Sequence, residues 1–246
     1  MLRPRVIPIL LMNAEGLLKT SRFSDPKYVG DPINAVKVFN EKEVDELVML
    51  DIDAWKNLKI DEKRLKSIAR EARMPLCYGG GISSVDVAEN IIQLGYEKVA
   101  VGRAAILDHD FVSALATRIG SQSVVASIDV QKRNGVYEIM LENGTKKINF
   151  DLIDLCVSLE SAGVGEIVLN SIDREGSLTG YDLEMANIAY SNLGIPVTVN
   201  GGCGSVEHMN NLIDQVGMVG LGVGSFFVFK GRFRAVILSY TKPVFT

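Results

Sequence analysis

The sequence predicts an α/β fold, a (β/α)8 TIM barrel with a two-fold half-barrel repeat, and three observations support this prediction. Eight short apolar runs recur along the 246 residues, and each is nearly continuous, as expected for strands buried on both faces of a parallel sheet. Helical patterns separate these runs, which is the alternation that such a barrel requires. In addition, the second half of the chain repeats the first.

The elements alternate in chain order. The strands are predicted at residues 6–11, 47–52, 76–78, 99–101, 124–128, 167–169, 197–199 and 218–221. The helices are predicted at residues 33–42, 62–72, 85–94, 111–119, 152–161, 182–191 and 206–213, with a last one near 233–239. Pro32 suits the first turn of the first helix, and Ser84 and Ser205 suit N-cap positions.

The repeat defines the expected organisation. Residues 44–50 match residues 164–170 at an offset of 120, and residues 74–76 match residues 195–197 at an offset of 121. We therefore expect one domain of residues 1–246, with half-barrels of about residues 1–120 and 121–246. A doubly wound open sheet is the alternative, but the first strand is not followed by the GxGxxG fingerprint.

Two long insertions follow predicted strands, at residues 12–31 and 130–150. Segments that follow strands lie at the carboxyl-terminal face, where the active sites of such barrels are found. The second insertion carries Asn143-Gly144 between two short strand-like runs, which predicts a β-hairpin.

Composition excludes several classes of protein. Lys and Arg number 26 against 30 Asp and Glu, so the net charge of −4 gives no footprint for nucleic acid or an anionic membrane. Three distant cysteines and two distant histidines argue against a metal site and favour a reducing, cytoplasmic location. The apolar stretch at residues 6–11 is too short for a signal peptide or a membrane span.

Two glycine-rich turns are candidate phosphate sites, because glycine lets backbone N–H groups approach an anion and a helix begins after each turn. The alternative is a pair of tight turns that merely need positive φ angles. The first candidate, called the first cup, combines Gly80, Gly81, Gly102 and Arg103. The second cup combines Gly201, Gly202, Gly224 and Ser225.

Acidic residues gather at the predicted strand ends. Asp129 ends a buried strand and precedes an insertion, so we expect its carboxylate to face the mouth of the barrel as a general acid or base. Asp51, Asp173 and Glu175 follow other strands and are either substrate-side groups or solvated turn charges.

Four charged residues lie at the opposite, amino-terminal strand ends and can form a ring at the bottom of the barrel. Spacing alone favours a stabilising salt-bridge plug, because that face normally carries stability. The four residues are Arg5, Glu46, Lys98 and Glu166.

The chain resembles the cyclase subunit of imidazole glycerol phosphate synthase along essentially its whole length. The motifs that carry the resemblance lie at residues 5–8, 30–32, 45–47, 50–52, 79–82, 171–174, 180–182 and 201–202. The resemblance implies a barrel that works with a glutaminase subunit bound at its amino-terminal face. Ammonia then crosses the barrel to a phosphorylated substrate at the carboxyl-terminal face, and no cofactor is needed.

The same resemblance assigns roles to residues. The ring of four charges becomes an ammonia gate, and Asp129 becomes one of two catalytic aspartates. Lys19, in a mobile loop after the first strand, and Ser171 join Asp51, Asp173 and Glu175 on the substrate side.

Two departures from the family pattern bear on the activity. The other catalytic aspartate falls on Leu11, which cannot transfer a proton, and losing a general acid or base costs roughly 10²–10⁴-fold in rate. In the first cup, Gly102 and Arg103 replace an asparagine and a threonine, and arginine can hold phosphate or carboxylate with two parallel hydrogen bonds.

Three functions are compatible with this resemblance and its departures. The chain is the cyclase of histidine synthesis, or a paralogue that passes ammonia to other chemistry such as surface-sugar amidination in lipopolysaccharide synthesis. Alternatively, it is a non-catalytic conduit that activates a glutaminase. Because of Leu11, the prediction is the redirected paralogue, with the other two as alternatives.

Overall fold

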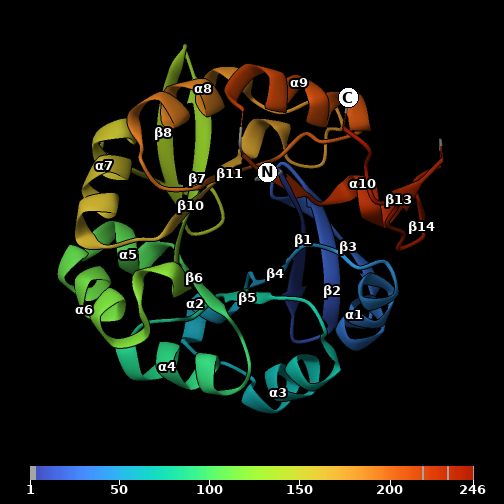
Figure 1. The fold of residues 1–246 in the computed structure, drawn as a ribbon, viewed down its shortest axis with the longest axis horizontal. Helices are drawn as coiled ribbons and strands as arrows, with labels where there is room; N and C mark the ends of the chain where they lie inside the picture. Colours follow the sequence, from blue (N-terminus) through green and yellow to red (C-terminus); the bar gives the residue numbers. More distant parts are fainter. Residues whose placement is uncertain (1–3, 218, 232, 246) are drawn as a thin grey trace.

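Eight parallel strands close into a barrel in the computed structural model, which describes residues 4–217, 219–231 and 233–245. Neighbouring strands pair in the order β10, β11, β12, β1, β4, β5, β6, β7, and pairing of β7 with β10 closes the ring (Figure 1). The predicted TIM barrel is therefore confirmed. The barrel strands are β1 (Arg5–Asn13), β4 (Leu47–Asp51), β5 (Leu76–Gly79), β6 (Lys98–Val101), β7 (Val124–Arg133), β10 (Glu166–Ser171), β11 (Val197–Asn200) and β12 (Gly220–Val223).

Helices surround the strands, and most begin at an acidic or serine N-cap. Ser84 Oγ accepts a hydrogen bond from the Val87 backbone N–H at 3.3 Å, and Ser205 Oγ accepts one from that of His208 at 3.2 Å, as their positions in the sequence predicted. The helices are α1 (Pro32–Glu41), α2 (Ala54–Asn57), α3 (Glu62–Glu71), α4 (Val85–Gln93), α5 (Arg103–Leu107), α6 (His109–Ile119), α7 (Leu152–Ala162), α8 (Leu183–Asn192), α9 (Val206–Val216) and α10 (Ser225–Val228). Two short 3₁₀ turns are η1 (Ser121–Ser123) and η2 (Ile172–Arg174).

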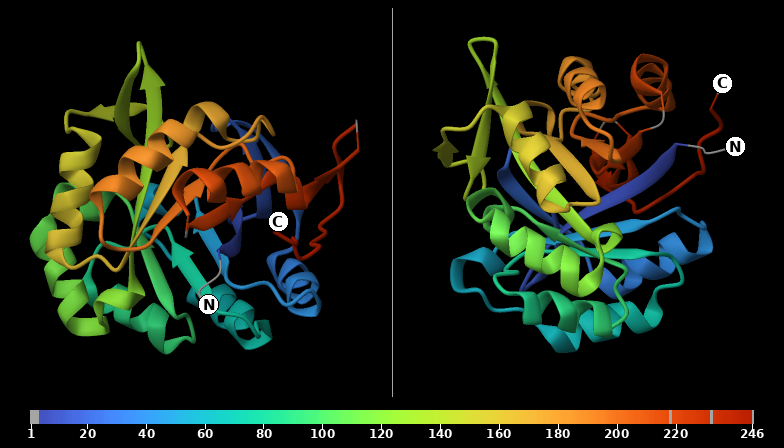
Figure 2. Two further views of the ribbon diagram at one scale, coloured as in Figure 1. Left: turned by 45° about the horizontal axis from the view of Figure 1, so that its top comes forward. Right: turned by 60° about the vertical axis from the view of Figure 1, so that its left-hand side comes forward.

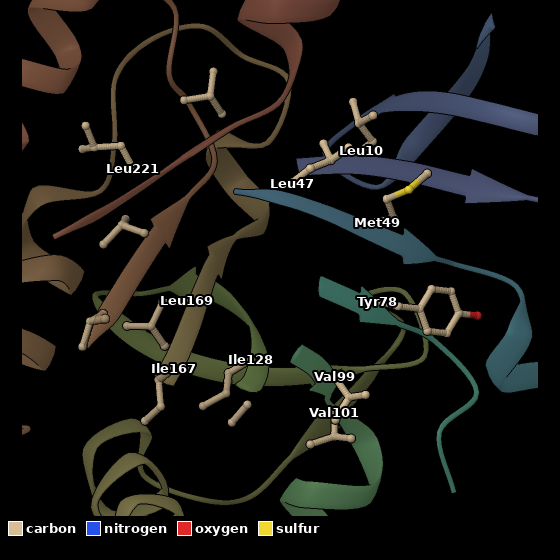
Figure 3. Close-up of a cluster of buried hydrophobic side chains, with 14 of the residues drawn as sticks. Leu10, Leu47, Met49, Tyr78, Val99, Val101, Ile128, Ile167, Leu169 and Leu221 are labelled. Carbon is tan, nitrogen blue, oxygen red and sulfur yellow. The ribbon is translucent and has the colours of Figure 1, made fainter. Parts of the chain in front are cut away.

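Alternate residues of each strand face opposite sides, so the barrel has two apolar layers. The larger layer lies between strands and helices, and Figure 3 labels ten of its side chains, among them Leu47, Tyr78 and Ile128. The smaller layer fills the interior of the barrel. Its buried members are Ile7, Ile9, Val48, Cys77, Ala100, Val125 and Val168.

Both insertions form antiparallel strands. The first forms β2 (Gly16–Ser21) and β3 (Ser24–Gly30), with β2 paired to the upper part of β1. The second forms the predicted hairpin, in which β8 (Val136–Leu141) pairs with the extended end of β7 and with β9 (Lys146–Ile148). Figure 2 shows the β7–β8 hairpin projecting beyond the barrel.

Two predictions near the carboxyl terminus need correction. The last helix, near residues 233–239, is wrong: this segment carries the strand β14 (Ala235–Val236), paired with β13 (Phe229–Lys230). Phe233, Val236 and Ile237 are exposed, so no apolar helix face packs there. The strand predicted at residues 218–221 begins at Gly220, and Met218 lies outside the described residues.

Across the described part of the chain, no helix combines the length and the apolar character needed to cross a membrane.

Candidate active site

A cavity of about 650 Å³ opens at the carboxyl-terminal ends of the strands. It lies mainly over β1 and the strands from β4 to β7, so it occupies the first half of the barrel and its border with the second. Its wall combines apolar side chains such as Leu50 and Trp55 with the carboxylates of Asp51 and Asp129. A cavity of this size, with few polar groups placed in an apolar wall, suits a small-molecule substrate.

Asp129 is the acid–base candidate of this cavity. It lies on β7 and pairs in register with Asn170 of β10, whose Nδ2 donates a hydrogen bond to Asp129 Oδ1 at 2.9 Å. Burial is the main cause that raises the pKa of Asp129 to about 6, and the nearby charge of Glu175 adds to the rise. A carboxyl group with a pKa near neutrality can both donate and accept a proton at working pH.

Leu11 lines the same cavity from the upper end of β1. Its side chain is buried, and it pairs in register with Leu50 of β4 and Leu18 of β2. The wall that β1 contributes to the cavity is therefore the apolar side chain of Leu11, which carries no group that transfers a proton.

The structure gives Asp51 and Asp173 local bonding partners. Asp51 Oδ1 accepts hydrogen bonds from the backbone N–H groups of Asp53 and Ala54 at 3.1 and 3.0 Å, while burial raises its pKa. Asp173 Oδ2 accepts the backbone N–H of Lys132 at 2.7 Å, so it supports the β7–β8 hairpin. Of these two aspartates, Asp51 lines the cavity and Asp173 does not. Ser171, the other residue predicted on the substrate side, is buried at the end of β10.

The first cup borders the cavity. Gly80, Gly81, Gly102 and Arg103 all line it, and the Arg103 guanidinium makes an ion pair of 2.6 Å with Glu142. Gly80 has a φ of +123°, and a Cβ there would lie 2.4 Å from the carbonyl oxygen of Asp51. Backbone packing alone therefore requires glycine at this position.

The second cup is nearly closed, with about 10 Å³ of space between Gly201, Gly202, Gly224 and Ser225. Lys19 fills it: a Cβ on Gly224 would lie 2.9 Å from Lys19 Nζ. The ammonium makes a buried ion pair of 2.6 Å with Glu175.

This arrangement places Lys19 on a strand and not in the loop that the sequence predicted. The residue lies on β2, which is hydrogen-bonded to β1 and β3. The structure also shows that Glu175 is a buried partner of Lys19 rather than a solvated charge.

The four charged residues at the opposite end form a closed ring, called here the basal ring. Arg5 donates to Glu46 and to Glu166 at 2.7 Å each, and Lys98 Nζ lies 2.9 Å from Glu46 Oε2 and 2.8 Å from Glu166 Oε2. Each carboxylate thus contacts both cations, and the ring is neutral overall.

The two carboxyls of the basal ring differ in pKa. Burial raises the pKa of Glu46 above its usual value. Burial acts on Glu166 as well, but the charges of Arg5 and Lys98 outweigh it and lower the pKa of that residue.

Among the described residues, no three His, Cys, Asp or Glu side chains are arranged to hold a metal ion.

The comparisons with known proteins agree with this geometry. A family model described as "Histidine biosynthesis protein" matches residues 5–234. The chain belongs to this family.

Individual relatives place the chain among the HisF-type subunits of the family. Proteins provisionally named as imidazole glycerol phosphate synthase subunit HisF or hisF2 are 49% identical in Leptospira borgpetersenii and 46% identical in Pseudomonas aeruginosa. In both cases, 98% of this chain and 96% of the relative are covered. The imidazole glycerol phosphate synthase subunit HisF of Lactococcus lactis subsp. cremoris is 34% identical over 92% of this chain and 89% of the relative.

Three residues of this HisF-type barrel escaped the sequence reasoning. Asn170 positions Asp129, and Thr198 Oγ1 donates to Glu166 Oε1 at 2.6 Å at the basal ring. A polar residue ending an apolar strand is a signal that identifies Asn170 as it did Asp129. Glu142 carries no such signal, because only the folded hairpin brings it to Arg103.

Proposed function

We propose that this HisF-type chain acts as a single domain of residues 1–246 that receives ammonia from a glutaminase subunit at its basal ring. The ammonia passes through the barrel and reacts with a phosphorylated or nucleotide-linked substrate at the mouth. We propose further that the acceptor is a surface sugar undergoing amidination rather than the intermediate of histidine synthesis. The observation that carries the redirection is Leu11, which lines the mouth where a second acid–base group is needed.

The interior of the barrel supports the ammonia route. On β1, Arg5 in the basal ring and Leu11 at the mouth are six residues apart, about 20 Å at ~3.3 Å per residue. Between them lies a cluster of buried apolar side chains that includes Ile7, Ile9 and Val48. Neutral ammonia can cross such a layer, whereas ammonium pays a large desolvation penalty there.

The basal ring supports a role as the entrance. Arg5 is one-third exposed and connects Glu46 to Glu166, so the ring faces solvent on the side where a partner would bind. Each glutamate keeps a contact with Lys98 if Arg5 swings away. Opening therefore leaves no carboxylate without a cation, which favours a gate over a permanent plug.

At the mouth, Asp129 has no acid–base partner on β1, although Asp51 also lines the cavity. Asp129, with a pKa of about 6, can protonate or deprotonate a substrate, but the wall opposite it on β1 is Leu11. The closure of an imidazole ring by the family's two-aspartate chemistry needs an acid and a base together. The provisionally named relatives of Leptospira borgpetersenii and Pseudomonas aeruginosa share 49% and 46% identity with this chain, against 34% for the HisF of Lactococcus lactis subsp. cremoris, which supports a separate branch.

A cyclase assay with excess ammonium salt tests the proposal. Excess ammonia bypasses both the glutaminase and the route through the barrel, so the assay reports on the acceptor chemistry alone. With the bisphosphorylated ribonucleotide of the histidine pathway, we expect the chain to turn over roughly 10²–10⁴-fold more slowly than the Lactococcus HisF. The Leu11→Asp variant should recover part of this rate.

Turnover by the unmodified chain equal to that of the Lactococcus protein would return it to histidine synthesis. A second measurement separates the remaining functions. Binding of a nucleotide-linked sugar to the chain alone supports sugar amidination. If neither substrate binds while the chain still stimulates a glutaminase, the chain is a conduit.

A further inference from the structure

An ion pair crosses the edge of the mouth at the first cup. Arg103 is the first residue of α5, and Glu142 lies in the turn between β8 and β9, 39 residues further along the chain. Arg103 Nη1 and Glu142 Oε1 are 2.6 Å apart, and the two side chains are 49% and 26% exposed. Both residues line the cavity of the mouth.

The turn that carries Glu142 is held over this cavity. Glu142 and Asn143 have φ angles of 54° and 55°, in the left-handed region. Asn143 Nδ2 donates a hydrogen bond of 3.2 Å to the carbonyl oxygen of Ile52, which follows β4. A Cβ on Gly144 would lie 3.2 Å from the Phe23 ring of the β2–β3 turn, so residues 142–144 contact two other segments at the mouth.

Glu142 is bound to the guanidinium of Arg103, the group that an anionic ligand would bind. A guanidinium binds carboxylate and phosphate with the same planar arrangement of N–H donors, so the two anions compete for it. Glu142 also lies 3.6 Å from Lys146 Nζ, four residues along the chain. If a ligand takes Arg103, Glu142 therefore keeps a cation beside it.

Lys19, another cation near the mouth, is bound in a different way from Arg103. The pair between Lys19 and Glu175 is almost wholly buried, with side chains only 5% and 3% exposed. Breaking a buried pair leaves an unpaired charge at high cost, whereas half-exposed pairs are weak and exchangeable. Arg103 can therefore change partners more easily than Lys19.

We propose that Glu142 is a specificity-determining residue that competes with the ligand's phosphoryl group for Arg103. A phosphate ester, with its higher charge, displaces Glu142 and releases the turn of residues 142–144 from α5, whereas a monocarboxylate does not. This inference rests on the proposed binding of a phosphorylated substrate at the mouth, and it names the residue that selects the anion.

Titration of the full chain with inorganic phosphate, followed by calorimetry at low salt, tests the proposal. In the Glu142→Gln variant the competing charge is absent, and we expect phosphate to bind about twofold to fivefold more tightly, the range that an exposed ion pair supports. In Arg103→Gln, affinity should fall, and the Arg103→Gln/Glu142→Gln double variant should show no gain over Arg103→Gln. Acetate should bind weakly to the unmodified chain and should gain affinity in Glu142→Gln, because the same carboxylate keeps it from Arg103.

A matched control separates this competition from a general effect of net charge. Glu89 and Arg118 form a pair of 2.7 Å with exposures of 29% and 55%, on the outer helices α4 and α6. Glu89→Gln removes the same charge from a similar pair, and phosphate affinity should not change.

Three results would overturn the proposal: unchanged or weaker phosphate binding by Glu142→Gln, an equal gain in Glu89→Gln, or no phosphate binding by any variant. If Glu142 only holds the turn in place, Glu142→Gln should bind phosphate more weakly. The sign of the change in phosphate affinity therefore distinguishes competition from a structural role. The cyclase assay stays independent of this result. Full turnover by the unmodified chain would refute the redirected function while leaving the competition at Arg103 in place.

Discussion

Replacing Asp129 with Asn should change how the stability of the protein depends on pH. The folded-state pKa of Asp129 is raised from 3.8 to about 6, mainly by burial. Native-state stability from this group is therefore fully present below about pH 4 and is lost as the pH rises through about 6. Asparagine carries no charge and can still accept the hydrogen bond from Asn170, so the variant escapes this loss.

The magnitude follows from the shift in pKa. At 1.36 kcal/mol per unit, a rise from 3.8 to about 6 corresponds to about 3 kcal/mol, and the partial exposure of Asp129 to the cavity reduces this to about 2–3 kcal/mol. Urea unfolding of both proteins between pH 4 and pH 8 measures it. The free energy of unfolding of Asp129→Asn, minus that of the unmodified chain, should rise by this amount from pH 4 to pH 7.

A difference that stays flat over this pH range would refute the reasoning, because it would mean that Asp129 ionises as freely in the folded chain as in the unfolded one. The Asn170→Ala variant gives an internal check. It removes the hydrogen bond that favours the charged form, so the pKa of Asp129 should rise further, as a carbon-13 carboxyl titration would reveal.

Three further substitutions probe the rest of the site. Lys98→Met takes one cation from the basal ring while Arg5 still contacts both glutamates, so unfolding at pH 7 should show a loss of about 2–3 kcal/mol; a loss below 1 kcal/mol would contradict a tightly coupled ring. Lys19→Met leaves Glu175 buried without its cation, so a loss of about 3–5 kcal/mol is expected, with faster hydrogen exchange in β2 and β3; unchanged exchange there would contradict a stabilising role for this pair. Gly202→Val places a Cβ 2.0 Å from the carbonyl oxygen of Gly180 at a φ of +95°; thermal unfolding should show a loss of ~3 kcal/mol or more, and an unchanged melting temperature would argue against this geometry.

The Gly202 result bears on the interpretation of the glycine cups. The sequence favoured phosphate binding over tight turns because two cups recur in the repeat. In the structure, both Gly80 and Gly202 meet backbone carbonyl groups at distances that exclude a Cβ. Backbone packing alone thus accounts for the glycines, and anion binding at the cups stays a prediction that the phosphate titration addresses.

Periodicity in the sequence determined the elements of the barrel and the ends at which charged residues lie. A strand whose residues are nearly all apolar is stable when both of its faces are buried, as in a parallel barrel. Residues at the two ends of such a strand lie at opposite ends of the barrel. For this reason, Asp129 and the four residues of the basal ring could be assigned to their faces before the fold was known. The repeat and the hairpin around Asn143-Gly144 were visible for the same local reasons.

Only the tertiary structure decided which charges meet. Lys19 and Glu175 are 156 residues apart, and Arg103 and Glu142 are 39 apart, so no local pattern links them. The last helix failed for a related reason, since β13 and β14 pair with each other and Arg234 donates a hydrogen bond to the carbonyl oxygen of Gly176, 58 residues away along the chain. The sequence by itself thus determined the barrel and the face of each acid. The partners that fill the second cup, occupy Arg103 and raise the pKa of Asp129 depend on burial and distance, which exist only once the chain has folded.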